Sequence, residues 1–369
     1  MKQVLVTGGC GFIGRYVVDE LLAQNYQVRV LDSFVEQVHG GNVPTMPAEV
    51  EVLRGDVRDA ALVKQALEGV EGVVHLAAEV GVGQSMYEIA RYVGGNDLAT
   101  AVLLENMIDS GVKRIVVASS MSVYGEGLYL SEDGTRQASI RRRPAAIKAG
   151  HWNPTDPNGG ALRPVATDEQ KPVDLASIYA LTKYAQEKEV LIFGEAYNVD
   201  AVALRLFNVF GPGQALSNPY TGVLANFASR LANGQAPMIF EDGEQQRDFV
   251  HVRDIARAFR LALEQRPAAG HVINIGSGNA YPIKRVATLL ATAMGVPEIE
   301  PEIMNKARSG DISNCFADIS KARELLGFEP QYRLEDSLEE LADWVREAGA
   351  VVDRGSEMRR QLEERGLVS

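Results

Sequence analysis

The segment from Thr7 to Gly14, with the sequence TGGCGFIG, restricts the fold of this chain more than any other part of it. It follows a short apolar run, Val4 to Val6, and leads into a helical pattern from Phe12 to about Asn25. Glycines at this spacing permit a tight turn, let a bound group approach the backbone, and let the helix pack closely on the strand. The pattern therefore predicts a buried strand, a glycine turn and a helix at the start of the chain.

A carboxylate ends the second predicted strand, which runs from Val28 to Asp32. The free N–H groups and the positive dipole end of the first helix favour the phosphates of a bound dinucleotide. Asp32 lies at the distance from the glycine turn at which an acidic side chain binds the hydroxyls of an adenosine ribose. Because a carboxylate repels a 2′-phosphate, the sequence predicts NAD rather than NADP as the cofactor.

Strands and helices alternate along the first part of the chain. Further predicted strands lie at Val52–Leu53, Gly72–Leu76 and Arg114–Ala118, with helical patterns at Leu62–Leu67 and Ala99–Ile108. This alternation predicts an α/β fold, a Rossmann-type doubly wound parallel sheet. After Phe210 the elements become shorter, which indicates a smaller α/β C-terminal lobe that binds the substrate.

Two packed lobes are expected because 369 residues exceed the usual size of a single core. The first, an NAD-binding domain, is predicted to contain residues 1–207 together with about 249–275. The second, a substrate-binding domain, is predicted to contain residues 208–248 and 276–369.

An insertion at about residues 127–175 interrupts the first domain and is longer than an ordinary connection. Such a long segment is expected to be an irregular loop, either a functional lid or disordered. We interpret its arginine run, Arg141 to Arg143, as a solvated face; the alternative is that it attracts the phosphates of a substrate. No metal site is predicted there, because His151 is a lone imidazole and the only cysteines of the chain are Cys10 and Cys315.

A second group of residues has the side-chain types and the spacing of a catalytic site. Tyr179 and Lys183 are four residues apart, on one face of a predicted helix, and Ser120 lies at the end of a predicted strand, where open α/β sheets bind ligands. A neighbouring ammonium and a positive nicotinamide ring would both lower the pKa of a tyrosine. Tyr179 is therefore the expected general base, and Ser120 is expected to donate a hydrogen bond to the substrate oxygen.

These residues belong to a series of motifs that runs through nearly the whole chain. The motifs are Thr7-Gly8-x-x-Gly11-x-x-Gly14, Asp56-Val57, His75-Leu76-Ala77-Ala78, Ser119-Ser120-x-x-Val123-Tyr124-Gly125, Tyr179-x-x-x-Lys183, Arg205-Leu206-Phe207-Asn208, Arg247-Asp248-Phe249-Val250-His251-Val252-x-Asp254 and Arg308-x-Gly310-Asp311. In this order they resemble the extended short-chain dehydrogenases/reductases. The last two resemble motifs of the nucleotide-sugar epimerases of that family, such as the UDP-glucose 4-epimerases and the dTDP-L-rhamnose 4-epimerases.

The resemblance implies roles for individual residues. The implied cofactor-binding residues are Gly8, Gly11, Phe12, Ile13, Gly14, Asp32, Asp56, Val57, Leu76, Ala77, Ala78, Asn96, Ser120, Tyr179, Lys183 and Phe207. Asp56 and Val57 would hold adenine, and Asn96 would border the nicotinamide half. The implied substrate-binding residues are Ser120, Tyr179, Asn208, Arg247, Arg308, Asp311 and Cys315. Asn208 and the two arginines would bind the diphosphate, for which a guanidinium fork is suited.

Departures from the family pattern narrow the expected reaction. Met121 and Ser122 replace the Asp-Glu pair with which the related 4,6-dehydratases eliminate water, so dehydration is not expected. Val80 replaces a lysine that is common in galactose epimerases. Cys315 stands at a position where a tyrosine restricts some epimerases, so a roomier sugar pocket is implied; alternatively, Cys315 is a small buried apolar residue.

The function expected from these observations is that of an NAD-dependent nucleotide-sugar 4-epimerase acting on a UDP- or dTDP-hexose through a transient 4-keto intermediate. Two alternatives remain open: a nucleotide 4-ketosugar reductase or dehydrogenase, and an inactive NAD-binding protein. The net charge of −12 argues against nucleic acid and anionic lipid as partners. With no signal or membrane segment recognised, a cytoplasmic location is expected. The resemblance implies a homodimer that pairs helices near residues 98–107 and 178–193.

Overall fold

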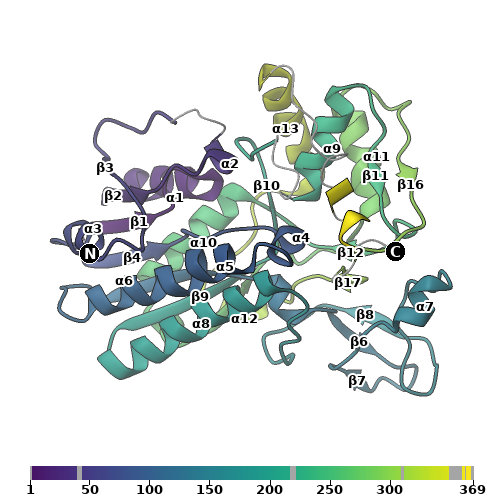
Figure 1. Ribbon diagram of the computed structural model, residues 1–369, viewed down its shortest axis with the longest axis horizontal. Helices are drawn as coiled ribbons and strands as arrows, with labels where there is room; N and C mark the ends of the chain where they lie inside the picture. The colour runs from purple at the N-terminus through teal and green to yellow at the C-terminus, as the bar shows by residue number, and fades with distance from the viewer. Residues whose placement is uncertain are drawn as a thin grey trace.

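The computed structural model describes residues 2–39, 44–216, 222–308, 311–348, 360–361 and 363–366, and Gly310 of the last motif lies outside them. At the centre is a seven-stranded parallel sheet with the strand order β14-β9-β5-β4-β1-β2-β3 (Figure 1). Its strands are β1 (Gln3–Thr7), β2 (Gln27–Asp32), β3 (Glu51–Arg54), β4 (Gly72–His75), β5 (Arg114–Ser120), β9 (Asp200–Leu206) and β14 (Val272–Ile275). The order runs outward in both directions from β1 and β4, so the predicted doubly wound sheet is confirmed.

Helices cover both faces of this sheet. Val4 and Val6 pack beneath α1 (Phe12–Ala23) and α10 (Val252–Glu264), whereas Leu5 points to the opposite face. That face is covered by α3 (Ala60–Ala66), α6 (Ala99–Met107) and α8 (Ile178–Tyr197). Because both faces are buried, the strands are continuous apolar runs in the sequence. No helix in the described part of the chain is both long and apolar enough to cross a membrane.

Short helical segments follow the carboxyl ends of the strands, where a ligand would bind. They are α2 (Glu36–His39), α4 (Val82–Ser85), α5 (Ile89–Val93), the π-helical segment η1 (Gly94–Leu98) and the 3₁₀ segment η2 (Met121–Tyr124). Asp32, at the end of β2, and Ser120, at the end of β5, both stand at this edge of the sheet.

A smaller α/β lobe packs beside this edge, as the sequence predicts. The parallel strands β10 (Asn208–Phe210) and β13 (Phe249–His251) connect it to the first lobe. Its remaining elements are α9 (Val223–Ala232), β11 (Met238–Ile239), β12 (Gln246–Arg247), β15 (Tyr281–Pro282), α11 (Ile283–Ala293), β16 (Glu302–Ile303), β17 (Asn314–Cys315) and α13 (Leu334–Ala348). The three helices share one apolar core with Phe210 and Phe249.

One segment of the C-terminal part returns to the central sheet. The helix α12 (Ser320–Leu326) packs against β14, α10 and the short segment η3 (Arg266–Ala268), and Phe328 joins the core under α1 and α10. This segment packs with the first lobe although it falls within the range 276–369 predicted for the second.

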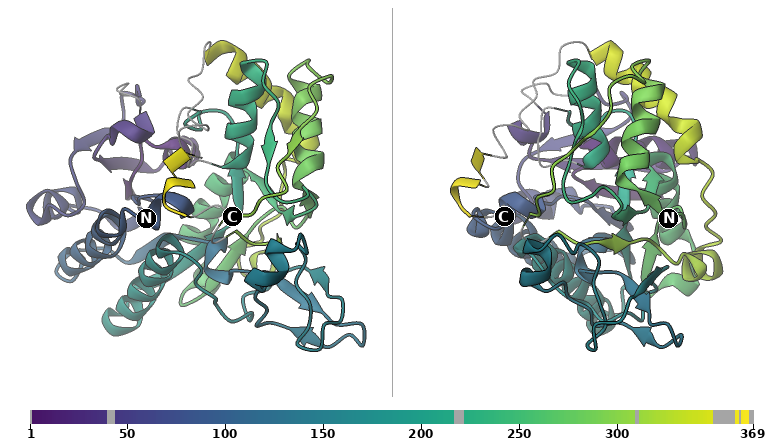
Figure 2. Two further views of the ribbon diagram at one scale, coloured as in Figure 1. Left: turned by 45° about the vertical axis from the view of Figure 1, so that its right-hand side comes forward. Right: turned by 90° about the vertical axis from the view of Figure 1, so that its right-hand side faces the viewer.

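The insertion is not the irregular loop expected from the sequence. It contains a three-stranded antiparallel sheet, in the order β7-β6-β8, and a short helix, α7 (Pro144–Lys148). The strands are β6 (Leu128–Leu130), β7 (Arg136–Gln137) and β8 (Arg163–Val165). Figures 1 and 2 show it as a projection beside the second lobe. Short strands paired across many residues leave little local periodicity, which is why the sequence pattern did not reveal them.

Candidate active site

A cavity of about 1130 Å³ lies between the two lobes, at the carboxyl ends of the central strands. Most of the residues that the sequence assigns to cofactor and substrate line it. They are Gly8, Gly11, Phe12, Ile13, Gly14, Asp32, Asp56, Val57, Leu76, Ala77, Ala78, Ser120, Tyr179, Lys183, Phe207, Asn208, Arg247, Arg308 and Asp311. Residues more than 300 positions apart in the chain therefore face one space. Asn96 and Cys315 do not line it.

The glycine turn presents open backbone to this cavity. A Cβ added at Gly14 would stand 2.2 Å from the carbonyl oxygen of Gly8, so this glycine is required for the close packing of helix and turn. Gly8 itself has a φ of +69°, in the left-handed region that favours glycine. At Gly11 an added Cβ would meet only the Gly8 oxygen, at 3.3 Å. The open backbone beside the N-terminus of α1 fits the pyrophosphate of a dinucleotide.

The Asp32 carboxylate is oriented by the backbone around it. Its Oδ2 accepts from the N–H of Cys10 at 2.9 Å, and its Oδ1 accepts from the N–H of Phe34 at 2.9 Å. Burial opposes its ionisation, but hydrogen bonds from His39, Phe34 and Cys10 hold the pKa of Asp32 below its usual value. The carboxylate therefore stays charged, and its remaining lone pairs can accept from the ribose hydroxyls.

Asp56, for which the resemblance implies adenine binding, forms a paired interaction that the sequence did not indicate. The Nε of Arg58 donates to one carboxylate oxygen of Asp56 at 2.9 Å, and a terminal nitrogen donates to the other at 2.6 Å. Both side chains are roughly half exposed, so this pair contributes little to stability. Arg58 lines the cavity beside Asp56 and Val57, where its planar guanidinium can contact a base.

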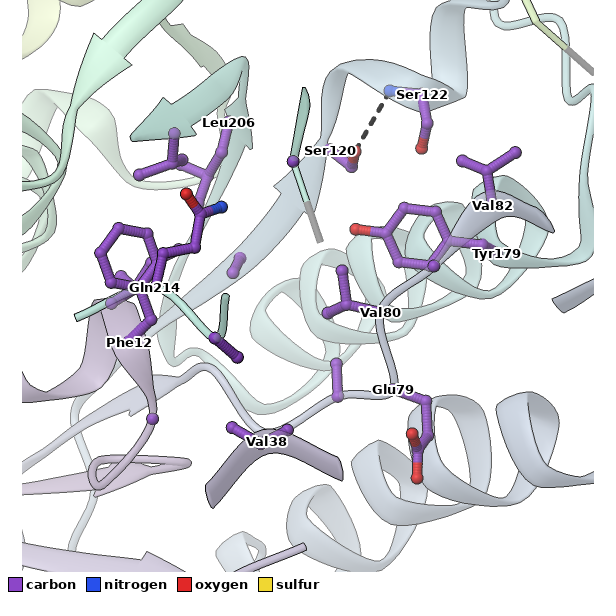
Figure 3. Close-up of a pocket in the computed structure, with 18 of the residues that line it drawn as sticks. Phe12, Val38, Glu79, Val80, Val82, Ser120, Ser122, Tyr179, Leu206 and Gln214 are labelled. Carbon is purple, nitrogen blue, oxygen red and sulfur yellow. Dashed lines mark hydrogen bonds between the residues drawn. The ribbon is translucent and has the colours of Figure 1, made fainter. Parts of the chain in front are cut away.

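Ser120 and Tyr179 meet where β5 ends and α8 begins. The Oγ of Ser120 accepts from the N–H of Ser122 at 3.2 Å, which caps η2 and orients the hydroxyl. Tyr179 lies in the first turn of α8, whose N-terminus is capped by the Ser177 hydroxyl. Figure 3 shows the Tyr179 hydroxyl pointing into the cavity on the side of Ser120. Both side chains line the cavity, so a substrate hydroxyl can reach both.

The electrostatics of Tyr179 differ from the expectation. Burial raises the pKa of the Tyr179 phenol, and the hydrogen bond with Ser120 only partly opposes this. Burial also lowers the pKa of Lys183 to about 7, with Asp97 acting in the opposite direction. The protein's own residues therefore do not lower the pKa of Tyr179. The expected lowering depends on positive charge that a bound nicotinamide ring would add.

Lys183 is held by a buried polar network. Its Nζ donates to the Oε1 of Gln186 at 2.7 Å, and the Nε2 of Gln186 donates to the Thr100 hydroxyl at 2.8 Å. His75 is hydrogen bonded to Thr7 and Thr100, and burial lowers its pKa to about 3, so this imidazole is neutral. The network fixes Lys183 beneath Tyr179, on the same face of α8.

The other two predicted site residues lie behind the cavity wall. Asn96 is fully buried; its Oδ1 accepts from the N–H of Glu79 at 2.7 Å, and its Nδ2 donates to the Thr182 hydroxyl at 2.9 Å. It thereby connects the segment after β4 to α8. Cys315 is buried in β17, with its thiol near the Thr167 hydroxyl. It packs as the small apolar residue that the alternative interpretation described.

The residues expected to bind the substrate include polar groups that can still form hydrogen bonds. The Oδ1 of Asn208 is buried and has no hydrogen-bond partner among the described residues. The Arg247 guanidinium donates to the backbone carbonyls of Ile312 and Ser313, at 2.6 and 2.8 Å. Arg308 is paired with Asp311 at 2.8 Å. These residues converge on one region and suit a phosphate-containing ligand.

The prediction of a solvated arginine face in the insertion holds for Arg141 and Arg143, which are exposed, but it was wrong for Arg142. Arg141 is exposed and pairs with Asp174, but the Arg142 side chain is only 4% exposed and pairs with Glu126 and Glu241. The alternative, in which the arginines attract substrate phosphates, gains no support either, because none of the three lines the cavity. The physical reason is that two distant carboxylates fold over Arg142, which no local pattern indicates.

Some cavity residues were missed by the sequence analysis. Glu79 and Gln214 line the cavity, and the Oε1 of Gln214 is buried without a partner among the described residues. Ser122 was considered only as a missing acid, yet it lines the same cavity, and its Oγ is buried with no hydrogen-bond partner in the part of the chain that the structure describes. The position of Glu79 in the cavity could have been inferred from the sequence, because Glu79 directly follows the Leu76–Ala78 motif.

Comparison with known proteins agrees with this site. The family model described as "NAD dependent epimerase/dehydratase family" matches residues 4–145 and 155–276. A curated relative, the dTDP-L-rhamnose 4-epimerase of Burkholderia thailandensis, is 36% identical over 351 residues, which cover 93% of this chain and 95% of the relative. The gap in the family match, residues 146–154, falls inside the insertion.

Two solved structures are similar to the whole fold. A UDP-glucose 4-epimerase from Thermotoga maritima with UDP-glucose has 30% identity and a TM-score of 0.76, covering 94% of this chain and 99% of that one. A UDP-glucuronic acid 4-epimerase from Bacillus cereus, in complex with UDP-glucuronic acid and NAD, has 26% identity and a TM-score of 0.77. This match also covers 94% of this chain and 99% of that one. The glycine turn, the Ser120–Tyr179–Lys183 group and these matches lead to one conclusion: the chain belongs to the NAD-dependent epimerase/dehydratase family.

Proposed function

We propose that this protein is a nucleotide-sugar 4-epimerase that inverts carbon 4 of a UDP- or dTDP-linked hexose through a transient 4-keto sugar. The observation that carries the proposal is that Ser120 and Tyr179 face the same cavity as Asn208 and Arg308. The first pair can handle a sugar hydroxyl, and the second can hold a diphosphate. The named activities of the similar proteins support the same reaction class.

In this mechanism Tyr179 moves the proton. Its phenol oxygen takes the proton of the sugar 4-hydroxyl and later returns it, while Ser120 donates a hydrogen bond to the same sugar oxygen. Hydride removal from carbon 4 and hydride return are the chemistry that NAD supplies when bound. Lys183, held by Gln186, places a titratable cation near the phenol. Met121 supplies no acid or base that would eliminate water instead.

Inversion also requires that the sugar turn while its nucleotide stays in place. Asn208, Arg247 and Arg308 would anchor the diphosphate, so the ketone can rotate about its bond to the phosphate and present its other face. Val80, which is 53% exposed on the cavity wall, makes no directional bond through its side chain and so does not favour one sugar orientation. An apolar wall at this point suits two sugar orientations.

The test uses a nucleotide hexose carrying deuterium at carbon 4, incubated with purified protein and no added cofactor. UDP-glucose, UDP-N-acetylglucosamine, UDP-glucuronate and dTDP-L-rhamnose form the panel. The expected result is the inverted product with the label still at carbon 4 and no net NADH. Release of a stable ketone, or turnover only with added NADPH and loss of label to it, would assign the protein to the reductases. No conversion of any substrate by cofactor-loaded protein would count for an inactive NAD-binding protein.

We further propose a homodimer that pairs α8 with the neighbouring helices α5, η1 and α6. Seven of the nine large apolar side chains that are exposed in the described part of the chain lie on or directly after these helices. They are Ile89, Val93, Leu98, Ile108, Leu181, Ile192 and Tyr197. Exposed apolar side chains gathered on neighbouring helices are typical of an interface between subunits.

Sedimentation equilibrium at micromolar concentration is expected to give twice the chain mass of 40.1 kDa. The double variant Leu98→Glu/Ile192→Glu should shift the mass to the monomer, because it buries charge in the interface. Val38→Glu is the control, since Val38 is also an exposed apolar residue but lies on α2, outside the helices proposed to pair. A monomeric wild-type protein contradicts the proposal.

A cytoplasmic location is part of the same proposal. Cys10 and Cys315 are both buried free thiols, and free thiols of this kind are typical of proteins in a reducing compartment. The nucleotide sugars proposed as substrates are hydrophilic, and the net charge of −12 disfavours anionic lipid surfaces.

A further inference from the structure

The insertion contributes a buried arginine, Arg142, to the contact between itself and the second lobe. The Nε of Arg142 lies 2.9 Å from the Oε1 of Glu126, and a terminal nitrogen lies 2.6 Å from the Oε1 of Glu241. All three side chains are at most 5% exposed. Glu126 directly precedes the insertion, Arg142 lies within it, and Glu241 belongs to the second lobe. We call these three residues the arginine triad.

The arginine triad is bonded to the segment that carries Arg308 and Asp311. The second terminal nitrogen of Arg142 donates to the carbonyl oxygen of Asp311 at 2.5 Å. Glu126 accepts from the backbone N–H of Ser313 at 2.8 Å, just beyond Asp311. On the other side of Arg308, the N–H of Glu241 donates to the carbonyl of Lys306 at 2.9 Å.

A ring contact completes the connection. Phe240, the neighbour of Glu241, lies beneath the guanidinium of Arg308 with 4.5 Å between the guanidinium carbon and the ring centre. Phe240, Arg308 and Asp311 line the cavity, whereas no member of the triad does. The triad therefore touches the substrate-binding residues from behind.

The geometry of the triad requires an arginine. Two carboxylates converge on one cation, and only the planar guanidinium offers enough donors to reach both and a backbone carbonyl at the same time. Burial alone would disfavour the charged Arg142, but Glu126 and Glu241 raise its pKa. Removing the cation would leave two buried carboxylates facing each other, and they would separate or draw in water.

We propose that Arg142 is a positioning residue for the substrate, which holds Arg308 and Asp311 at the cavity wall without touching the ligand. Through this side chain the insertion would influence substrate affinity. The inference rests on the proposed function, in which Arg308 binds the diphosphate of the nucleotide sugar. This positioning role of Arg142 differs from a general stabilising role. Its loss should affect the residues proposed to bind the substrate, and not those proposed to bind the cofactor.

The test compares Arg142→Met with the matched control Arg141→Met, which removes the neighbouring exposed arginine. For Arg142→Met we expect the KM for the nucleotide sugar and the Kd for UDP or dTDP to rise about tenfold or more, because small displacements of binding groups have effects of this size. The kcat at saturation should stay within about threefold and the Kd for NAD should not change. Hydrogen exchange should accelerate at residues 304–308 and 311–314 only. Arg141→Met should match the wild type in all of these measurements.

Two further variants separate positioning from charge balance. Arg142→Lys keeps the charge but not the fork, so an intermediate KM is expected. The triple variant Glu126→Gln/Arg142→Met/Glu241→Gln removes all three charges, so it leaves no unpaired buried carboxylate that could unfold the protein. Its KM should remain raised, because the hydrogen bond to the Asp311 carbonyl is still missing. A wild-type KM in the triple variant, or an equal loss of NAD affinity in Arg142→Met, would overturn the proposal. If the wild type itself binds no nucleoside diphosphate, the proposed function fails, while the hydrogen-exchange result still reports whether Arg142 holds the segment.

Discussion

Replacing Tyr179 by phenylalanine is expected to lower turnover of the nucleotide sugar by about 100-fold or more. The phenol oxygen is the only group of this side chain that can move a proton, and the ring is retained in its edge-on contact with Tyr92. Cofactor content and thermal stability should therefore stay close to those of the wild type. Steady-state kinetics, together with the NAD released on denaturation, measure both effects.

The matched control for this substitution is Tyr92→Phe. The Tyr92 ring packs edge-on against Tyr179, and its hydroxyl bonds to Gln84 at 3.2 Å, but it does not line the cavity. Loss of that hydroxyl should change stability modestly and turnover only by a few-fold. Activity of Tyr179→Phe within a few-fold of the wild type would remove Tyr179 from the mechanism. An equal loss in both variants would mean that the effect arises from packing.

Replacing Gly14 by alanine is the second change for which we expect a large effect. The new Cβ would stand 2.2 Å from the carbonyl oxygen of Gly8 and 2.6 Å from the Cα of Gly9. Because contacts below about 3 Å are strongly repulsive, helix α1 and the glycine turn must separate by roughly 1 Å. We expect NAD affinity to fall about 100-fold and the unfolding free energy to fall by about 1–3 kcal/mol or more. Calorimetric NAD titration and denaturant unfolding measure these two changes.

The variant Gly11→Ala distinguishes an effect on NAD binding from an effect on the stability of the fold. Its added Cβ would meet only the Gly8 oxygen, at 3.3 Å, and the backbone of Gly11, with φ −72° and ψ 179°, accepts alanine. This variant should therefore remain as stable as the wild type, yet bind NAD more weakly because the methyl group faces the cavity. If both variants bind NAD as the wild type does, the glycine turn is not the pyrophosphate site. If Gly11→Ala is as unstable as Gly14→Ala, the packing argument is wrong.

The central sheet was predicted almost completely from the sequence, and so was the set of predicted cofactor residues that line the cavity, Asn96 excepted. Both faces of the sheet are buried, so each strand leaves an apolar run, and the glycine turn and Asp32 are joined to successive strands. Tyr179 and Lys183 are one helical turn apart, which places them on one face whatever surrounds them. The small antiparallel sheet of the insertion was missed because its strands are only two or three residues long.

The sequence by itself indicated most of the predicted site residues that line the cavity, because a strand, a helical turn or a glycine motif is decided by residues a few positions apart. Only the tertiary structure decided how those residues are charged and held. Burial lowers the pKa of Lys183 to about 7 and raises that of Tyr179, and burial depends on every element packed around α8. Arg142 acquires its role from Glu241 and Asp311, which are 99 and 169 residues away along the chain. No local pattern encodes such pairs, because they form only when the insertion and the second lobe fold against each other.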